Sequence, residues 1–295
     1  MGKDYTESAI NKFISKVINA LLEIFTKHIV VNACLFYKSG RVMPRNWGDD
    51  INYFFLKKIF RRNVVCYDYS TLSHRIDRKN YLMIGSTITL LCNSKTFVWG
   101  AGVIDPKSEL PVHPLKVLAV RGPLTRKYLM EHGVECPEVY GDPALLIPRI
   151  YAPQIKKKYK LGIIPHYSDF ESSILEQLKQ NPEILFIKME GYKKWSDVID
   201  QILSCDQIAS SSLHGLILAE VYNIPNLWIE IEGNLLGGHF KFHDFFLSLG
   251  KDREKPYIIT DKITIEDIYK QIKHWEPGYI NLQPLIDASP FKLYL

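Results

Sequence analysis

The stretch DQIASSSLHGLILAEVYNIPNLW, from Asp206 to Trp228, holds two short apolar runs with a helix-like segment between them. QIASS and NLW are β-rich, whereas LHGLILAEVYN has apolar residues at helical spacing. A strand, a helix and a second strand in this order form a unit with parallel strands, because the crossover helix returns the chain to the same end of the sheet. The stretch therefore predicts an α/β fold.

The same alternation extends in both directions along the chain. Before the stretch come IVVNACLFY, DDINYFFLKKIF, YLMIG, TFVWGAGV and KVLAVRG, and closer to it come LGIIPH and EILFIKM. The pattern lapses in PRIYAPQIKKKYK, between Pro148 and Lys160. We therefore expect two Rossmann-like halves that face a cleft, an N-terminal domain over 1–150 and a C-terminal domain over 151–295.

Composition narrows the class of protein. The 295 residues are 46% hydrophobic and 23% charged, which is typical of a soluble globular chain. A net charge of +5 favours anionic partners only weakly, and we expect no nucleic acid. Five cysteines without a CxxC pair suggest neither a metal site nor a disulfide framework, so a cytoplasmic location is expected. GAGVID lacks the third glycine of a dinucleotide-binding loop, and no GxxxxGK[ST] phosphate loop occurs, so the sequence supports neither NAD nor ATP binding.

The N-terminal segment AINKFISKVINALLEIFTKHIVV predicts an amphipathic helix. Charged residues interrupt its hydrophobic run, so we expect neither a signal peptide nor a membrane span. Its apolar positions follow helical spacing: Ile10, Phe13, Ile14, Val17, Ile18, Leu21, Leu22 and Phe25. We expect these residues to pack on the core, and a helix lying on a membrane surface is the alternative.

Polar residues after the predicted strands mark the edge where ligands of parallel sheets bind. They are Arg121, Asp142, His166, Lys188, His214 and Glu230. Arginine and histidine suit a compact anion, since they donate hydrogen bonds and histidine can also transfer a proton. Arg121 ends an apolar run and needs an anionic partner, for which Asp142 and a bound anion are the two candidates.

His214 follows three serines that already supply capping oxygens, so its imidazole is redundant as a cap. We expect it to be an exposed side chain that serves chemistry. The hydroxyl of Ser212 and the free N–H groups from Leu213 onward could also hold an anion at the helix N-terminus. His166 and Lys241 are further anion donors, and Asp49 is either a helix cap or a base that faces the cleft.

Five segments together resemble the polysaccharide pyruvyl transferase family: NWGDDIN, VWGAGV, LAVRGPLTRKYLMEHG with VYGDPALL, LGIIPHYSD and SSLHGLILAEVYNIP. The resemblance covers about residues 30 to 250. It implies a GT-B-like arrangement and transfer of the enolpyruvyl carbons of phosphoenolpyruvate onto two sugar hydroxyls, which leaves a cyclic pyruvate ketal. In such an enzyme the N-terminal domain would be the acceptor side and the C-terminal domain the donor side.

The resemblance also carries residue roles. Arg121 and His214, which follows Leu213, match donor-site residues of the family. We name His214, Arg121, His166 and Asp49 as catalytic candidates, and Arg121, Ser212, Leu213, His214 and Lys241 as donor-binding candidates. Phosphoenolpyruvate is then a substrate, and no cofactor is expected.

The acceptor would be a sugar of a cell-surface polysaccharide or its precursor, free or lipid-linked. A lipid-linked acceptor implies peripheral contact with the inner face of the membrane. The segment IGSTI departs from the family, because many members have a glycine run there. A GT-B glycosyltransferase with a nucleotide-sugar donor is the alternative, with His214 and Glu220 against a diphosphate and a ribose.

Overall fold

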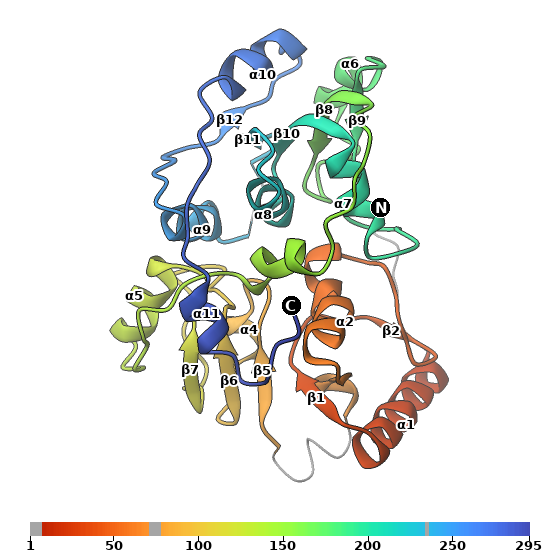
Figure 1. Cartoon of the computed structure of the whole chain (residues 1–295), viewed down its shortest axis with the longest axis vertical. Helices are drawn as coiled ribbons and strands as arrows, with labels where there is room; N and C mark the ends of the chain where they lie inside the picture. Colours follow the sequence, from red (N-terminus) through yellow and green to blue (C-terminus); the bar gives the residue numbers. More distant parts are fainter. Residues whose placement is uncertain (1–7, 71–77, 234–235) are drawn as a thin grey trace.

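The computed structural model describes residues 8–70, 78–233 and 236–295 and has an α/β fold in which helices flank parallel sheets (Figure 1). These residues form two five-stranded sheets and one antiparallel hairpin, β2 (Tyr37–Lys38) with β3 (Arg41–Val42). Every strand pair within the two larger sheets is parallel. The predicted fold class is confirmed at this level.

The first sheet has the strand order β4–β1–β5–β6–β7. Its strands are β4 (Asn63–Cys66), β1 (His28–Val31), β5 (Asn80–Leu82), β6 (Thr96–Trp99) and β7 (Lys116–Ala119). The helices between these strands include α2 (Trp47–Phe60) and α4 (Ile88–Leu91), η1 is the short 3-10 helix Tyr67–Tyr69, and α5 (Pro123–Glu131) follows β7. Asn46 caps α2, since its side chain accepts a hydrogen bond from Gly48 N–H.

The second sheet has the order β12–β11–β10–β8–β9. Its strands are β12 (Tyr257–Ile258), β11 (Asn226–Glu230), β10 (Cys205–Ser210), β8 (Tyr159–Ile164) and β9 (Ile184–Phe186). The associated helices are η3 (Ser173–Leu175), α6 (Glu176–Lys179), α7 (Asp197–Leu203), α8 (Leu213–Val221), α9 (Phe240–Ser248) and α10 (Ile265–Ile272). The stretch from Asp206 to Trp228 forms β10, α8 and β11 as expected, with Ile208 beside Asn226.

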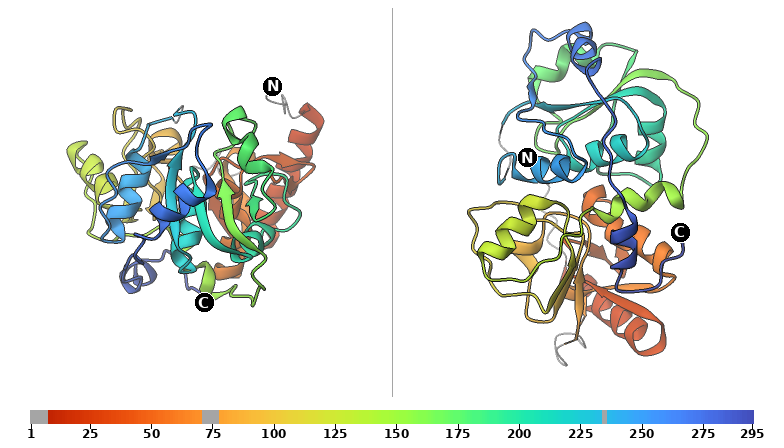
Figure 2. Two further views of the ribbon diagram at one scale, coloured as in Figure 1. Left: turned by 90° about the horizontal axis from the view of Figure 1, so that it is seen from above. Right: turned by 60° about the vertical axis from the view of Figure 1, so that its left-hand side comes forward.

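The end of the chain lies against the first sheet. After α10, the chain runs past the second sheet to α11 (Gln283–Asp287), which contacts the end of β6 (Figures 1 and 2). Trp99 Nε1 donates a 2.8 Å hydrogen bond to Leu285 O, and Tyr294 N donates one of 2.8 Å to Ile59 O. Between the two sheets the chain passes through η2 (Pro143–Arg149), and only its last two residues belong to the segment Pro148–Lys160 where the pattern of the sequence lapses.

The N-terminal helix differs from the expectation. Helix α1 (Ala9–Phe25) forms where the spacing predicts it, but Ser15, Asn19 and Glu23 are the buried side chains. Six of the eight apolar positions named above are exposed, and Ile18 and Leu22 are intermediate. The prediction of core packing is therefore wrong, because helical spacing reports that one apolar face exists and not what covers it. Within the described residues no helix has the length and apolarity needed to cross a membrane.

Candidate active site

A pocket of about 300 Å³ is lined by segments that follow strands of both sheets and by the N-termini of three helices. Its lining includes Asp49 of α2, His166 after β8, Ser212, Leu213 and His214 at the start of α8, and Lys241 of α9. The structure thus brings together every catalytic or donor-binding candidate that was named from the sequence, except Arg121. Ser86 and Arg45, which the sequence analysis did not single out, also line this pocket.

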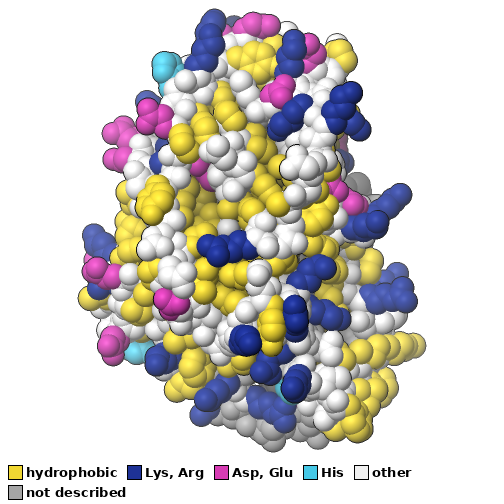
Figure 3. Space-filling view, viewed as in Figure 1, with side chains coloured by type: hydrophobic (Ala, Val, Ile, Leu, Met, Phe, Trp, Pro, Cys, Tyr) yellow, Lys and Arg dark blue, Asp and Glu magenta, His cyan; other side chains and the backbone are white. Residues whose placement is uncertain are grey.

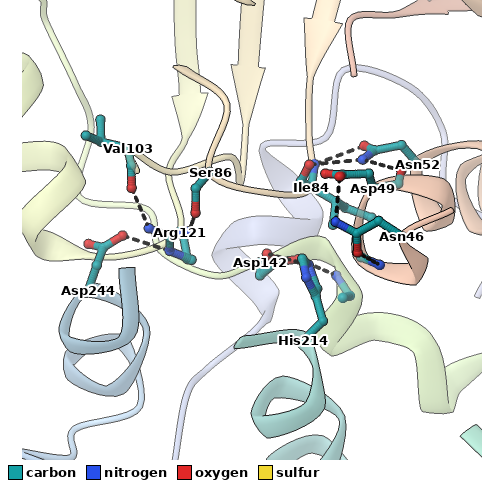
Figure 4. Close-up of polar contacts among 12 residues, drawn as sticks. Asn46, Asp49, Asn52, Ile84, Ser86, Val103, Arg121, Asp142, His214 and Asp244 are labelled. Carbon is teal, nitrogen blue, oxygen red and sulfur yellow. Dashed lines mark hydrogen bonds and ion pairs between the residues drawn. The ribbon is translucent and has the colours of Figure 1, made fainter. Parts of the chain in front are cut away.

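His214 is packed and not exposed. Only 13% of its side chain is accessible, and a Cβ added to Gly48 would lie 2.1 Å from its Nδ1. Its Nε2 lies 4.0 Å from Asp142 Oδ2 and has no hydrogen-bond partner within the described residues (Figure 4). Burial, with the positive charges of Arg121 and Lys241, lowers the pKa of His214 to about 3. The imidazole is therefore neutral at pH 7.

The serines before His214 have separate tasks. Ser210 Oγ donates to the backbone, and it accepts a 3.0 Å hydrogen bond from Ser212 N–H. Ser211 Oγ accepts from His166 N–H at 2.7 Å, so it holds the loop after β8. Ser212 is the N-cap of α8, yet its side chain makes no capping hydrogen bond. Because Ser212, Leu213 and His214 line the pocket, the Ser212 hydroxyl and the first N–H groups of α8 are available to bind an anion there.

Arg121 is fully buried behind the pocket wall. Its Nε donates to Asp244 Oδ2 at 3.0 Å, Nη2 donates to Val103 O at 3.0 Å, and Nη1 donates to Ser86 Oγ at 2.5 Å (Figure 4). The direct ion-pair partner is thus Asp244 of α9, and not Asp142, which was one of the two candidates from the sequence. Asp244 could not be recognised in the sequence, because 123 residues separate it from Arg121.

Ser86 connects Arg121 to the pocket. Gly85, with φ of 108°, turns the chain so that the Ser86 side chain lies between the guanidinium and the pocket lining. Because Ser86 Oγ accepts a hydrogen bond from Arg121, its own hydroxyl hydrogen remains free to donate into the pocket. The departure IGSTI in the sequence was the signal that could have found this residue.

Asp49 and Lys241 titrate near neutral pH. Burial and the neighbouring Asp50 raise the pKa of Asp49 to about 7, although Asn46 Nδ2 donates to it at 2.7 Å. Burial and Arg121 lower the pKa of Lys241 to about 8, which Asp49 partly offsets. The pKa of His166 falls to about 4, through burial and Lys241. Among the groups that line the pocket, those that titrate near neutral pH are thus a carboxyl and an amine, whereas both imidazoles are neutral there.

Four residues of the strand-end set lie outside the pocket lining: Arg121, Asp142, Lys188 and Glu230. Lys188 pairs with Glu171 at 3.4 Å, and Glu230 Oε2 lies 2.5 Å from His239 Nε2. The structure contains no group of three His, Cys, Asp or Glu side chains placed to hold a metal ion within its described residues. The pocket therefore offers helix N-termini, hydroxyls, imidazoles and one buried ammonium, which suit a small anion.

Comparison with known proteins identifies the family of this chain. The chain is 27% identical over 247 residues to the succinoglycan biosynthesis protein ExoV of Rhizobium meliloti (strain 1021), an alignment that covers 81% of this chain and 72% of that protein. It is 28% identical over 234 residues to the uncharacterized protein L143 of Acanthamoeba polyphaga mimivirus, covering 75% of this chain and 78% of the viral protein. The family model for polysaccharide pyruvyl transferase matches residues 19–233, which include Asp49, His166 and His214. The chain belongs to the polysaccharide pyruvyl transferase family.

Proposed function

We propose that this protein transfers the enolpyruvyl carbons of phosphoenolpyruvate to two hydroxyls of a sugar in a cell-surface polysaccharide or its precursor. The product is a cyclic pyruvate ketal. The observation that carries the proposal is the meeting of Lys241, Ser86 and the α8 N-terminus around one small pocket. Phosphoenolpyruvate is a compact polyanion, and each of these groups donates a hydrogen bond to an anion.

We assign the donor's anionic groups to the side of the pocket formed by α8 and α9. The N–H groups of Leu213 and His214, the Ser212 hydroxyl and the Lys241 ammonium would hold phosphate and carboxylate oxygens. Arg121 would act through Ser86, whose hydroxyl it orients, and through its positive charge behind the wall. Clamps of this kind stabilise charge that develops in a transition state, by about 3 kcal/mol for a well-placed donor.

The reaction then needs one proton at carbon. A proton adds to the methylene carbon of the donor, a sugar hydroxyl forms a bond to C2, and the second hydroxyl adds as the C2–O bond to phosphate breaks. One of the two hydroxyl protons restores the acid that protonated the carbon, and the other leaves with inorganic phosphate. His214 or His166 would supply the first proton, because a bound polyanion raises an imidazole pKa. Asp49 would accept a hydroxyl proton.

We also propose the domain arrangement that this chemistry requires. Residues 1–150 and 151–295 would be Rossmann-like domains in a GT-B-like pair, with the acceptor on the side of α2 and the donor on the side of α8. The reaction would take place in the cytoplasm, on a free or lipid-linked acceptor. The pocket lining supports this view, because Asp49 and Ser86 come from the first range and His166, Ser212 and Lys241 from the second.

Thermal-shift measurements with candidate donors test the proposal. Phosphoenolpyruvate should raise the melting temperature, and UDP, GDP and CMP should not. Mass spectrometry of acceptor glycosides incubated with phosphoenolpyruvate should then show a gain equal to one pyruvic acid less one water, with release of phosphate. Stabilisation by a nucleotide but not by phosphoenolpyruvate would favour the glycosyltransferase instead.

One observation already weakens the glycosyltransferase alternative. Glu220, the residue that would bind a ribose, lies 2.5 Å from Lys251 Nζ and 3.3 Å from Arg253 Nη2. It also accepts a hydrogen bond from Trp275 Nε1, and only 3% of its side chain is accessible. Glu220 therefore stabilises the chain after α9 and is not presented to a ligand.

A further inference from the structure

Helix α1 carries its apolar residues on the outside of the molecule. The accessible fraction is 68% for Phe13, 50% for Leu21 and 76% for Phe25. Ile10, Val17 and Ile24 are exposed on the same helix. At 17 residues, α1 is about 25 Å long, so it presents an extended apolar strip. Single exposed apolar side chains are ordinary, but a contiguous strip of this kind marks an interaction surface.

The opposite face of α1 fixes this orientation through polar contacts. Gly40 N donates to Ser15 Oγ at 3.1 Å, and Ser39 Oγ donates to Asn11 Oδ1 at 2.8 Å. Glu23 lies 3.6 Å from Arg78 Nη1 and accepts a hydrogen bond from Ser70. Turning the helix to bury its apolar strip would break these contacts and leave polar groups unsatisfied. The outward strip is therefore part of the folded structure.

A basic cluster continues the strip at the C-terminal end of α1. We define the cluster as Lys27, Lys57, Arg61 and Arg62, which line one surface hollow together with Asn63. None of the four forms an ion pair with a carboxylate in the part of the chain that the structure describes. Figure 3 shows Lys and Arg side chains gathered beside the apolar surface at the lower right, where α1 lies in Figure 1.

We propose that α1 and the basic cluster form a docking surface for a bilayer with anionic headgroups. An amphipathic helix lies in the membrane interface with its apolar face among the acyl chains, and neighbouring Lys and Arg residues bind anionic lipids. The charges favour this partner over a second copy of the chain, because a copy related by two-fold symmetry would bring the same cations toward each other. The inference is independent of the reaction proposed above, since it requires no substrate.

Vesicle flotation tests this surface with the full chain. The wild type should float with vesicles of phosphatidylcholine containing about one third phosphatidylglycerol, and bind pure phosphatidylcholine at least about tenfold more weakly. Phe13→Asp/Leu21→Asp should abolish flotation, because it places charges in the apolar strip. Lys27→Gln/Lys57→Gln should weaken binding to the anionic vesicles roughly 10- to 30-fold and reduce its dependence on salt.

Val112→Asp/Leu115→Asp is the matched control. It replaces two exposed apolar residues next to β7, at the edge of the sheet opposite to β4, which α1 contacts, and should leave flotation unchanged. Circular dichroism of each variant verifies the fold. Absence of wild-type binding to anionic vesicles would overturn the proposal. So would a wild-type dimer in light scattering that Phe13→Asp/Leu21→Asp converts to a monomer, without binding to lipid.

Discussion

Asp49 and Lys241 give the pocket two groups that titrate near neutral pH, with pKa values of about 7 and 8. A base must be ionised and an anion-binding amine must be protonated, so kcat/KM should follow a narrow bell with limbs near these two values. Phosphate release measured between about pH 5 and 10 reports this profile.

Two conservative variants assign the limbs of that profile. Asp49→Asn should lower the rate and remove the limb near pH 7, apart from the titration of the donor phosphate itself, which has a pKa of about 6. Lys241→Arg should move the alkaline limb beyond the measured range, since a guanidinium stays protonated. An unchanged acid limb in Asp49→Asn would show that another group, or the substrate alone, titrates there.

His214 should contribute to both activity and stability, because its ring is packed against Gly48 as well as facing the pocket. His214→Asn should reduce ketal formation by about 100-fold. Lost packing should also lower the melting temperature at pH 7 by roughly 3 to 9 °C. The exposed histidine expected from the sequence would have left stability unchanged.

Acidification should distinguish His214 from an ordinary packing residue. Its folded-state pKa of about 3 lies below the unfolded value of 6.5, so the folded protein binds this proton less tightly. The stability that depends on neutral His214 is then complete above pH 6.5 and is lost as the pH falls toward 3. The difference in melting temperature between wild type and His214→Asn should therefore shrink below about pH 6. A constant difference would contradict the buried neutral imidazole.

At the scale of elements, the ion pair of Arg121 with Asp244 joins the end of the first sheet to α9. Asp244 also accepts hydrogen bonds from Thr125 N at 2.8 Å and Thr125 Oγ1 at 2.7 Å. Arg121→Lys keeps one charge but cannot maintain all three guanidinium contacts, so it should lower the free energy of unfolding by about 3 kcal/mol or more. Urea denaturation measures this loss.

Arg126→Lys is the control for that variant. Arg126 Nη2 pairs with Glu138 at 3.3 Å, but 71% of the Glu138 side chain is accessible, so the change should be below about 1 kcal/mol. Equal stability of Arg121→Lys and wild type would mean that Arg121 contributes more to ligand binding than to the free energy of unfolding. The resemblance to the family favoured that view, because Arg121 matches a donor-site arginine there.

Local patterns predicted which elements form, but not how their side chains meet. The alternation of β-rich and helical segments was sufficient to predict the parallel strands, because each strand or helix is indicated by a few adjacent residues. The same local logic placed His166 and His214 after strands and Ser212 at the start of a helix, and all three line the pocket. It could not orient α1, since a lipid-facing strip and a core-facing strip have the same period. Contacts across the fold, such as Arg121 with Asp244, leave no local signal.

At the scale of the whole molecule, the C-terminal segment connects the two sheets. The buried Glu220 holds the chain near Trp275 and Gly278, and the residues that follow pack on the first sheet through Leu285 and Phe291. The segment thus restrains the side of the molecule that carries α8 relative to the side that carries α2. Because the pocket takes residues from both sides, we expect its shape to depend on this distant contact.

Leu285→Ala tests that dependence. Leu285 is fully buried, so the smaller side chain leaves a cavity, whereas the backbone carbonyl that accepts the hydrogen bond from Trp99 is retained. Such a cavity should lower the free energy of unfolding by about 2 to 5 kcal/mol in urea titrations followed by tryptophan fluorescence. Leu295→Ala removes the same atoms at a site that is 40% exposed, and should cost much less. If the C-terminal segment holds the pocket together, Leu285→Ala should also weaken the stabilisation by phosphoenolpyruvate, whereas Leu295→Ala should keep it. Normal stabilisation by the donor in a clearly destabilised Leu285→Ala protein would show that the pocket keeps its shape without this contact.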